Sequence, residues 1–265
     1  MKFARPCRWL AAATMAAAHL EPAIAAAPYP TGAWIVRQVA VDDQDERNAV
    51  FKKDDPRLVD RIMRIGTDGA LDFNRTAEAC GKVEWKALPK LKLSRLVSQT
   101  FRRLPEYGRP RTPTLSDFGL QVHDQSVAPL QAICHAGDGN TAPAPWGHTP
   151  WFVSLGDAKL AVAYDGAGVL LLDALPPTAP VRPSFDCQRA GSPAEKAICS
   201  SQELAGFDRS VARVYASVLQ EADDRRRAPI IQEQQAWLKS RDACEANVEC
   251  LQDSMNRRLG LLVQY

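Results

Sequence analysis

The sequence contains none of the short motifs that usually mark a catalytic centre or a metal site. Only four of its 265 residues are histidines, and no His-Glu-x-x-His pattern surrounds any of them. It also lacks a Gly-x-Ser-x-Gly elbow and a Cys-x-x-Cys pair, which are typical of serine hydrolases and of redox or zinc sites. We therefore expect no enzymatic activity, no metal and no cofactor. A cluster of carboxylates around His123 or His148 would contradict this expectation.

Net charge is also missing once the first residues are set aside. The whole chain has 33 Lys and Arg against 31 Asp and Glu, a formal charge of +2. Residues 1–25 contribute Lys2, Arg5 and Arg8 against Glu21, so the rest of the chain is formally neutral. A neutral chain has no overall field that attracts nucleic acid or an anionic membrane, so neither is an expected partner.

No apolar run is long enough to span a bilayer. The run from Trp9 to Leu20 falls short of the ~20 residues that a membrane helix needs. It follows a basic start and precedes Ala23-Ile24-Ala25, which together form the pattern of a secretory signal peptide. We predict that residues 1–25 are removed on export to the periplasm or the extracellular space.

Export makes the cysteines informative. Cys7 lies within the predicted signal peptide, and six others remain: Cys80, Cys134, Cys187, Cys199, Cys244 and Cys250. An even number of cysteines in an oxidising compartment predicts disulfides, although many connectivities are possible. We favour sequential pairing, 80–134, 187–199 and 244–250, because each predicted domain then closes on itself.

Residues 28–175 carry strand signals and one helix signal. An aromatic and β-branched run begins at Gly32, and Thr67-Asp68-Gly69 separates two short runs as a hairpin turn does. Apolar residues at helical spacing from Leu88 to Leu104 predict one amphipathic helix. Further strands are predicted at 130–134, 151–155, 160–164 and 169–173, where turns containing Asp favour an antiparallel meander. We expect a mainly antiparallel β domain, a meander or small barrel, of unknown type.

Prolines mark the end of this domain. Four of them fall between Leu175 and Pro183. Proline continues neither a helix nor a sheet ladder and holds the chain extended. We predict an interdomain linker at 176–183.

Residues 184–265 are predicted to be helical. Ser192, Pro193 and Glu195 form a helix start, and Ser200 with Glu203 repeats the capping pattern for a longer helix that runs to about Arg227. Pro229 is expected to begin the next helix, and a last helix follows the 244–250 loop. The predicted class is therefore α+β, a β domain followed by a small all-α domain clipped by disulfides, which compensate for a thin core.

The helical region resembles the LprI-like lysozyme inhibitor domain, a family of exported bacterial proteins. The resemblance covers the last third of the chain. It rests on the four cysteines from Cys187 onward and on nine motif residues: Phe185, Asp186, Glu195, Ile198, Asp208, Tyr215, Trp237, Arg241 and Asp242. It implies a helical, disulfide-clipped, exported domain. Some relatives inhibit lysozyme, but the family supplies no inhibitory residues that can be carried to this sequence.

We interpret most of these motif residues as structural. Phe185, Ile198, Tyr215 and Trp237 recur at helical spacing, so we expect them in a core. Asp208 and Asp242 are expected as caps or as partners of Arg241 and nearby arginines. The run from Asp223 to Arg227 is expected to be a solvated helix end.

We interpret the protein as an exported, non-catalytic binding protein of the bacterial cell envelope, in keeping with a lysozyme inhibitor. Lysozyme acts with two carboxyl groups beside the scissile bond. An inhibitor needs a rigid element whose donors meet those acids, and both the 187–199 and the 244–250 loop are candidates. Residues from Ser184 onward hold eleven Lys and Arg against twelve Asp and Glu, so steering toward a cationic lysozyme is not expected.

Two other functions stay open from the sequence. One is an envelope interaction or assembly module without inhibitory activity, whose two domains bind proteins. The other is a small-ligand-binding β-barrel with a helical accessory domain, which requires a deep apolar cavity in residues 28–175. No pattern indicates the oligomeric state.

Overall fold

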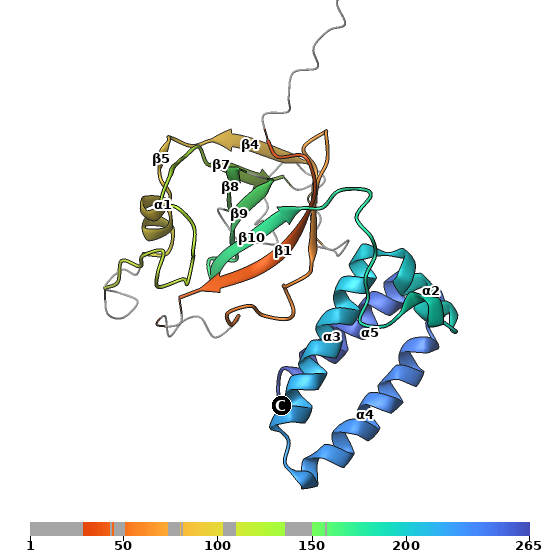
Figure 1. The fold of residues 1–265 in the computed structure, drawn as a ribbon. Helices are drawn as coiled ribbons and strands as arrows, with labels where there is room; N and C mark the ends of the chain where they lie inside the picture. Colours follow the sequence, from red (N-terminus) through yellow and green to blue (C-terminus); the bar gives the residue numbers. More distant parts are fainter. Residues whose placement is uncertain are drawn as a thin grey trace, which may run out of the picture.

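The chain folds into a β-rich part followed by a helical part (Figure 1). The structure is a computed structural model, and it describes residues 29–42, 44, 51–73, 80, 82–102, 110–135, 150–156 and 158–265. The β-rich part ends at residue 174, and the prolines of the predicted linker lead into the helices. The predicted α+β class is confirmed. The predicted signal peptide lies outside the described residues.

Eight strands form one antiparallel sheet in the described part of the chain, and two short strands pair beside it. The order in the large sheet is β3-β2-β1-β10-β9-β8-β7-β4, and β5 pairs with β6. The strands are β1 (Gly32–Val41), β2 (Ile62–Ile65), β3 (Leu71–Phe73), β4 (Val83–Ala87), β5 (Leu91–Lys92), β6 (Ser126–Val127), β7 (Leu130–Cys134), β8 (Trp151–Gly156), β9 (Lys159–Tyr164) and β10 (Gly168–Ala174). Strands β7 to β10 are the predicted meander.

The predicted hairpin joins β2 to β3. Gly69 has a φ of +84°, a conformation that favours glycine, so the Asp-Gly turn forms where the sequence indicates it. The backbone also approaches another strand here, because Trp85 of β4 donates its indole N–H to the Gly69 carbonyl at 3.0 Å. A glycine at position 69 thus serves both the turn and the contact with β4.

The first disulfide lies where the two edges of the sheet approach each other. Cys80 exchanges backbone hydrogen bonds with Leu71 of edge strand β3, at 2.7 and 3.0 Å. Its sulfur is bonded to Cys134 of β7, the neighbour of the other edge strand. The bridge therefore fastens the sheet into the near-barrel shape, and the predicted 80–134 pairing is confirmed.

Side chains fill the inside of this near-barrel. Aromatic rings pack there, with Trp85 edge-on to Phe152 at 5.0 Å and Phe73 beside Tyr164 at 5.7 Å. Eighteen buried residues form the cluster around them, from Val36 on β1 to Leu172 on β10. These packed side chains occupy space that a ligand would need inside the near-barrel, which argues against the ligand-binding barrel.

One helix covers the outer face of the sheet. Helix α1 (Leu93–Thr100) buries Leu93, Leu96 and Val97 against residues such as Trp151. It is shorter than predicted, because Leu91 and Lys92 pair with β6 instead of beginning the helix. The apolar spacing that suggested a helix from Leu88 is shared between a strand and a helix.

The helical part contains a short 3-10 helix η2 (Cys187–Arg189) and four α-helices, α2 (Pro193–Ser200), α3 (Gln202–Glu221), α4 (Asp224–Asp242) and α5 (Val248–Leu262). Its core is small and consists of Ala194, Ile198, Leu204, Phe207, Val211, Leu251, Met255, Leu259 and Leu262. Phe185, Tyr215 and Trp237 pack against this core and are partly buried.

The helix ends agree only in part with the predicted ones. Ser192 and Glu195 form the predicted capping box of α2. The cap of α3 is Ser201 and not Ser200, because Ser201 accepts the Leu204 N–H. Helix α3 ends at Glu221, short of the predicted Arg227. Asp223 caps α4 by accepting two backbone N–H groups, so the arginines and Pro229 lie inside the first turns of α4.

Candidate functional site

The two remaining disulfides lie at the same end of the helical part. Cys187–Cys199 ties η2 to α2, and Cys244–Cys250 closes the turn from α4 to α5, so the predicted pairings are present. Helix α2 lies beside the end of α4 from which that turn departs (Figure 1). Two covalently closed loops are therefore held close together on one end of the molecule.

Arg241 holds this end together from within. Its guanidinium is 6% exposed and pairs with Asp242 at 2.7 Å and with Asp208 of α3 at 3.9 Å. It also lies over the Trp237 ring, 5.6 Å from the centroid. Asp208 in turn accepts the Ser184 backbone N–H at 2.6 Å, which fixes the end of the linker. The side chains of Arg241 and Asp208 are thus buried beneath the loops, whereas that of Asp242 is 37% exposed.

The 187–199 loop presents hydrogen-bond donors to solvent. Gln188, Arg189 and Lys196 are exposed on it. Its carboxylates are engaged in local structure, since Asp186 accepts the Gln188 N–H. Glu195 accepts the N–H groups of Ser192 and Gly191, which lowers the pKa of its carboxyl group. The loop thus offers cationic donors with few competing acceptors.

The 244–250 loop has the opposite character. Its exposed side chains include Glu245, Glu249 and Val248, the last 41% exposed. Asn247 is used as the cap of α5, where it accepts the Cys250 N–H at 3.0 Å. The loop contains no Lys or Arg, so it presents carboxylates and an apolar side chain.

The helical part docks on the β-rich part through a close backbone contact. Gly206 of α3 lies against the carbonyl oxygen of Asp60, where an added Cβ would collide. Asp60 itself has a φ of +66°, so the chain turns sharply at this point. Ser210, one turn along α3, donates its hydroxyl to the Val59 carbonyl at 3.3 Å. The first half of α3 is therefore buried between the helical core and the segment 54–61.

A buried arginine fills the same interface. Arg61 has no exposed surface, and its guanidinium lies 3.6 Å from the centroid of the Phe207 ring. Its Nε donates to the Arg57 carbonyl at 3.0 Å and its Nη2 to the Pro56 carbonyl at 3.3 Å. Burial lowers the pKa of Arg61 to about 9, and repulsion from Arg209 and Arg213 acts in the same direction.

The Asp60 side chain gathers three arginines, which we call the Asp60 arginine cluster. Arg213 and Arg209 of α3 reach one carboxylate oxygen at 3.0 and 3.3 Å, and Arg37 of β1 reaches the other at 3.5 Å. Arg37 also contacts Asp173, which pairs with Lys159. Among the described residues, these ion pairs join four cations to two carboxylates, a formal sum of +2.

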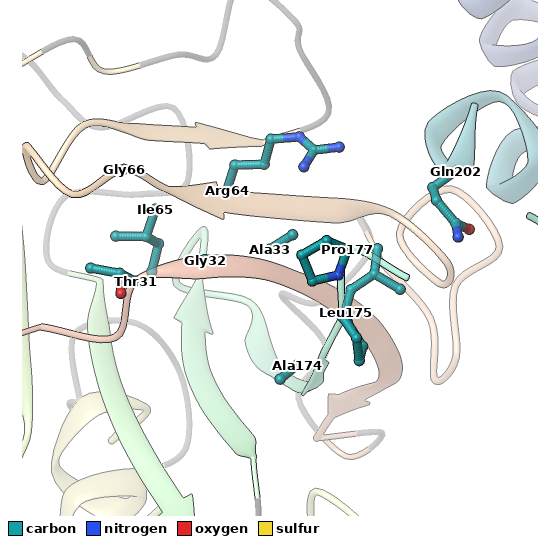
Figure 2. A pocket seen from close by; sticks show the side chains of 11 residues that line it. Thr31, Gly32, Ala33, Arg64, Ile65, Gly66, Ala174, Leu175, Pro177 and Gln202 are labelled. Atoms are coloured by element: carbon teal, nitrogen blue, oxygen red, sulfur yellow. The ribbon is translucent and has the colours of Figure 1, made fainter. Parts of the chain in front are cut away.

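A hollow of about 560 Å³ opens where the linker leaves the sheet (Figure 2). Its walls come from the start of β1, the end of β2, and residues 174–177, and they are largely apolar. Arg64 extends along it toward the helix that carries Gln202 (Figure 2). The Arg64 guanidinium pairs with Glu203 of α3. This ion pair is a further contact between the two parts of the molecule.

The histidines do not assemble with acidic ligands in the described part of the chain. His135 contacts Glu84 alone at 3.2 Å, and no group of three His, Cys, Asp or Glu residues there could hold a metal ion. His148 lies outside the described residues. None of the described helices is long and apolar enough to cross a membrane.

Most residues of the interface were not predictable from local sequence patterns. Asp60, Arg61 and the three arginines of the Asp60 arginine cluster follow no local motif, because they come together only when the two parts dock. Gly206 is the exception. A glycine in the middle of a helical pattern is unfavourable unless another backbone approaches it closely, so it was an available signal.

Residues 187–262 match the family model described as Lysozyme inhibitor LprI. The match covers the helical part alone, which is an LprI domain as the resemblance predicted. Searches of curated proteins and of solved structures found no match for the chain. For the β-rich part, the structure is therefore the only basis for an interpretation.

Proposed function

We propose that this protein is an exported, non-catalytic inhibitor of lysozyme that acts through the disulfide-clipped end of its LprI domain. The match of residues 187–262 to an inhibitor family carries this proposal. Three disulfides support export, because such bonds persist in oxidising compartments. The signal peptide over residues 1–25 belongs to the same proposal.

The charges of the two loops favour the 187–199 loop as the inhibitory element. Lysozyme places two carboxyl groups in its cleft, and a ligand must bring donors to them. Arg189 and Lys196 supply such donors, whereas Glu245 and Glu249 on the other loop would bring carboxylates against carboxylates. The Cys187–Cys199 bond lowers the entropy that the loop loses on binding.

Inhibition kinetics with the full mature chain test the proposal. We expect competitive inhibition of a C-type lysozyme by the wild type. Arg189→Gln combined with Lys196→Gln should raise the inhibition constant at least about tenfold, because truncating a buried interfacial charge costs about 2–5 kcal/mol. Glu245→Gln with Glu249→Gln is the matched control and should change the constant less than about threefold.

The association rate offers a second readout. The helical part has a formal charge of −1, so it provides almost no attraction for a cationic lysozyme. We expect an association rate constant of about 10⁵–10⁷ M⁻¹s⁻¹ with weak dependence on salt. Absence of inhibition of any lysozyme would overturn the proposal. Equal loss in both pairs of variants would overturn the choice of loop.

A further inference from the structure

The Asp60 arginine cluster holds more positive charge and more hydrogen-bond donors than the protein itself uses. Arg37, Arg209 and Arg213 converge on one carboxylate, and their hydrogen bonds to described residues use five of roughly fifteen N–H groups. The side chains of Arg37 and Arg213 are 51% and 50% exposed. These two side chains therefore keep about half of their surface open to a ligand.

The geometry already suits an oxygen anion. Three guanidinium groups within 3.5 Å of the Asp60 carboxylate form a fork of the kind that binds carboxylate and phosphate groups. The two α3 arginines are four residues apart and lie on one helix face, and Arg37 comes from the β-rich part. Docking of the two parts creates this arrangement, and neither part has it alone.

The surroundings increase the excess of positive charge. Arg61 lies buried beside the cluster, and the pKa of its guanidinium falls because of burial first and then because of Arg209 and Arg213. The backbone carbonyl of Arg182 accepts a hydrogen bond from Arg209 and helps to hold it in place. An incoming anion would reduce repulsion among these groups.

We propose that the Asp60 arginine cluster is a binding site for an oxyanion, a phosphate or carboxylate group of an anionic ligand. The site lies at the docking interface and not on the disulfide-clipped end. It goes beyond the proposed inhibition, because none of its arginines belongs to the 187–199 loop. The protein then has two separate surfaces that bind anionic groups.

Titration of the full mature chain with pyrophosphate and with a short polyglutamate tests this site. We expect one-to-one binding of at least one of them, with a dissociation constant of about 0.1–1 mM at low salt. The two probes distinguish a phosphate source from a carboxylate source. Arg37→Gln and Arg213→Gln should each weaken binding about tenfold.

Asp60→Asn provides a test with the opposite sign. Asparagine is nearly the same size and tolerates the left-handed backbone at this position. Removing the internal carboxylate should tighten anion binding about three- to tenfold, since one competing negative charge is lost. A merely structural role for the cluster does not predict tighter binding.

The arginines at the start of α4 serve as matched controls. Arg225 and Arg226 are also exposed and belong to the first turn of α4. That end of α4 lies away from α2 (Figure 1). Substituting both with Gln should leave the dissociation constant unchanged. If a cluster variant folds poorly, NMR of the wild type decides, because ligand must shift the Nε–H signals of Arg37, Arg209 and Arg213. Absence of binding, or equal effects of cluster and control variants, would overturn the site.

Discussion

The two parts of this molecule are held in shape by different means. The β-rich part has a large filled interior, and its one disulfide fastens the approach of two sheet edges across 54 residues of sequence. The LprI domain has a core of nine fully buried apolar residues, and its two disulfides close loops of 12 and 6 residues. It gains further burial by docking the first half of α3 on the segment 54–61. A small domain can thus use its neighbour as part of its own core.

The largest expected effect comes from removing the disulfide of the β-rich part. Replacing Cys80 and Cys134 by Ala should lower the free energy of unfolding by about 4 kcal/mol, because the closed loop is long. The Cys244–Cys250 pair closes a much shorter loop and should cost about 2 kcal/mol. Chemical denaturation of both variants under oxidising conditions measures the difference. A larger loss for the 244–250 pair would contradict this comparison.

The next effect concerns the scaffold of the LprI domain. Arg241→Gln removes a cation from two buried or partly buried carboxylates, and we expect a loss of about 3 kcal/mol in unfolding free energy. Arg257 pairs with Asp253 at 4.0 Å, but its side chain is 72% exposed. Arg257→Gln should change stability by less than about 0.5 kcal/mol. Similar losses in both variants would show that the buried ion pairs of Arg241 contribute no more to stability than an exposed pair does.

Substitutions at two separate glycines test whether the two parts are closely docked. Gly206→Ala forces a Cβ onto the Asp60 carbonyl, so we expect a net loss of about 1–3 kcal/mol despite the better helix propensity of Ala. Gly260 lies in α5 with open space around it, and Gly260→Ala should gain about 0.5–1 kcal/mol. Thermal unfolding distinguishes the two signs. A gain at position 206 would mean that the two parts are not closely docked.

The smallest effect depends on pH. Burial raises the pKa of Glu203, but hydrogen bonding and the charge of Arg64 outweigh it and leave that pKa below its ordinary value of 4.5. The ion pair therefore stabilises the protein above pH 4.5, and its contribution is lost as the pH falls through the lowered pKa. Glu203→Gln should cost about 1–2 kcal/mol at pH 7 and almost nothing at strongly acid pH. A pH-independent difference between the two proteins would contradict this interpretation.

Local sequence signals predicted the parts of the fold that depend on neighbouring residues. The Asp68-Gly69 turn, the Ser192 capping box and all three cysteine pairs appear as expected. Strand β4 was missed, because its five residues alternate charged and apolar side chains over too short a length. The helix start predicted at Pro229 was wrong, because Asp223, six residues earlier, caps the helix.

The candidate site was predictable only where its residues lie close together in the sequence. The donor-bearing 187–199 loop could be proposed from its cysteines, and the charges of its side chains were already readable. The Asp60 arginine cluster could not be predicted, because Arg37 and Arg209 are far apart in sequence and meet only when the two parts dock. Contacts of this kind need the packing of two folded parts.

Hydrogen–deuterium exchange with and without a C-type lysozyme tests the central claim most directly. Amides of residues 187–199 should become protected in a one-to-one complex. Those of 244–250, and those around the Asp60 arginine cluster, should exchange as in the free protein. Protection confined to either of these other regions, or no change with excess lysozyme, would contradict the claim that the clipped donor loop is the inhibitory element.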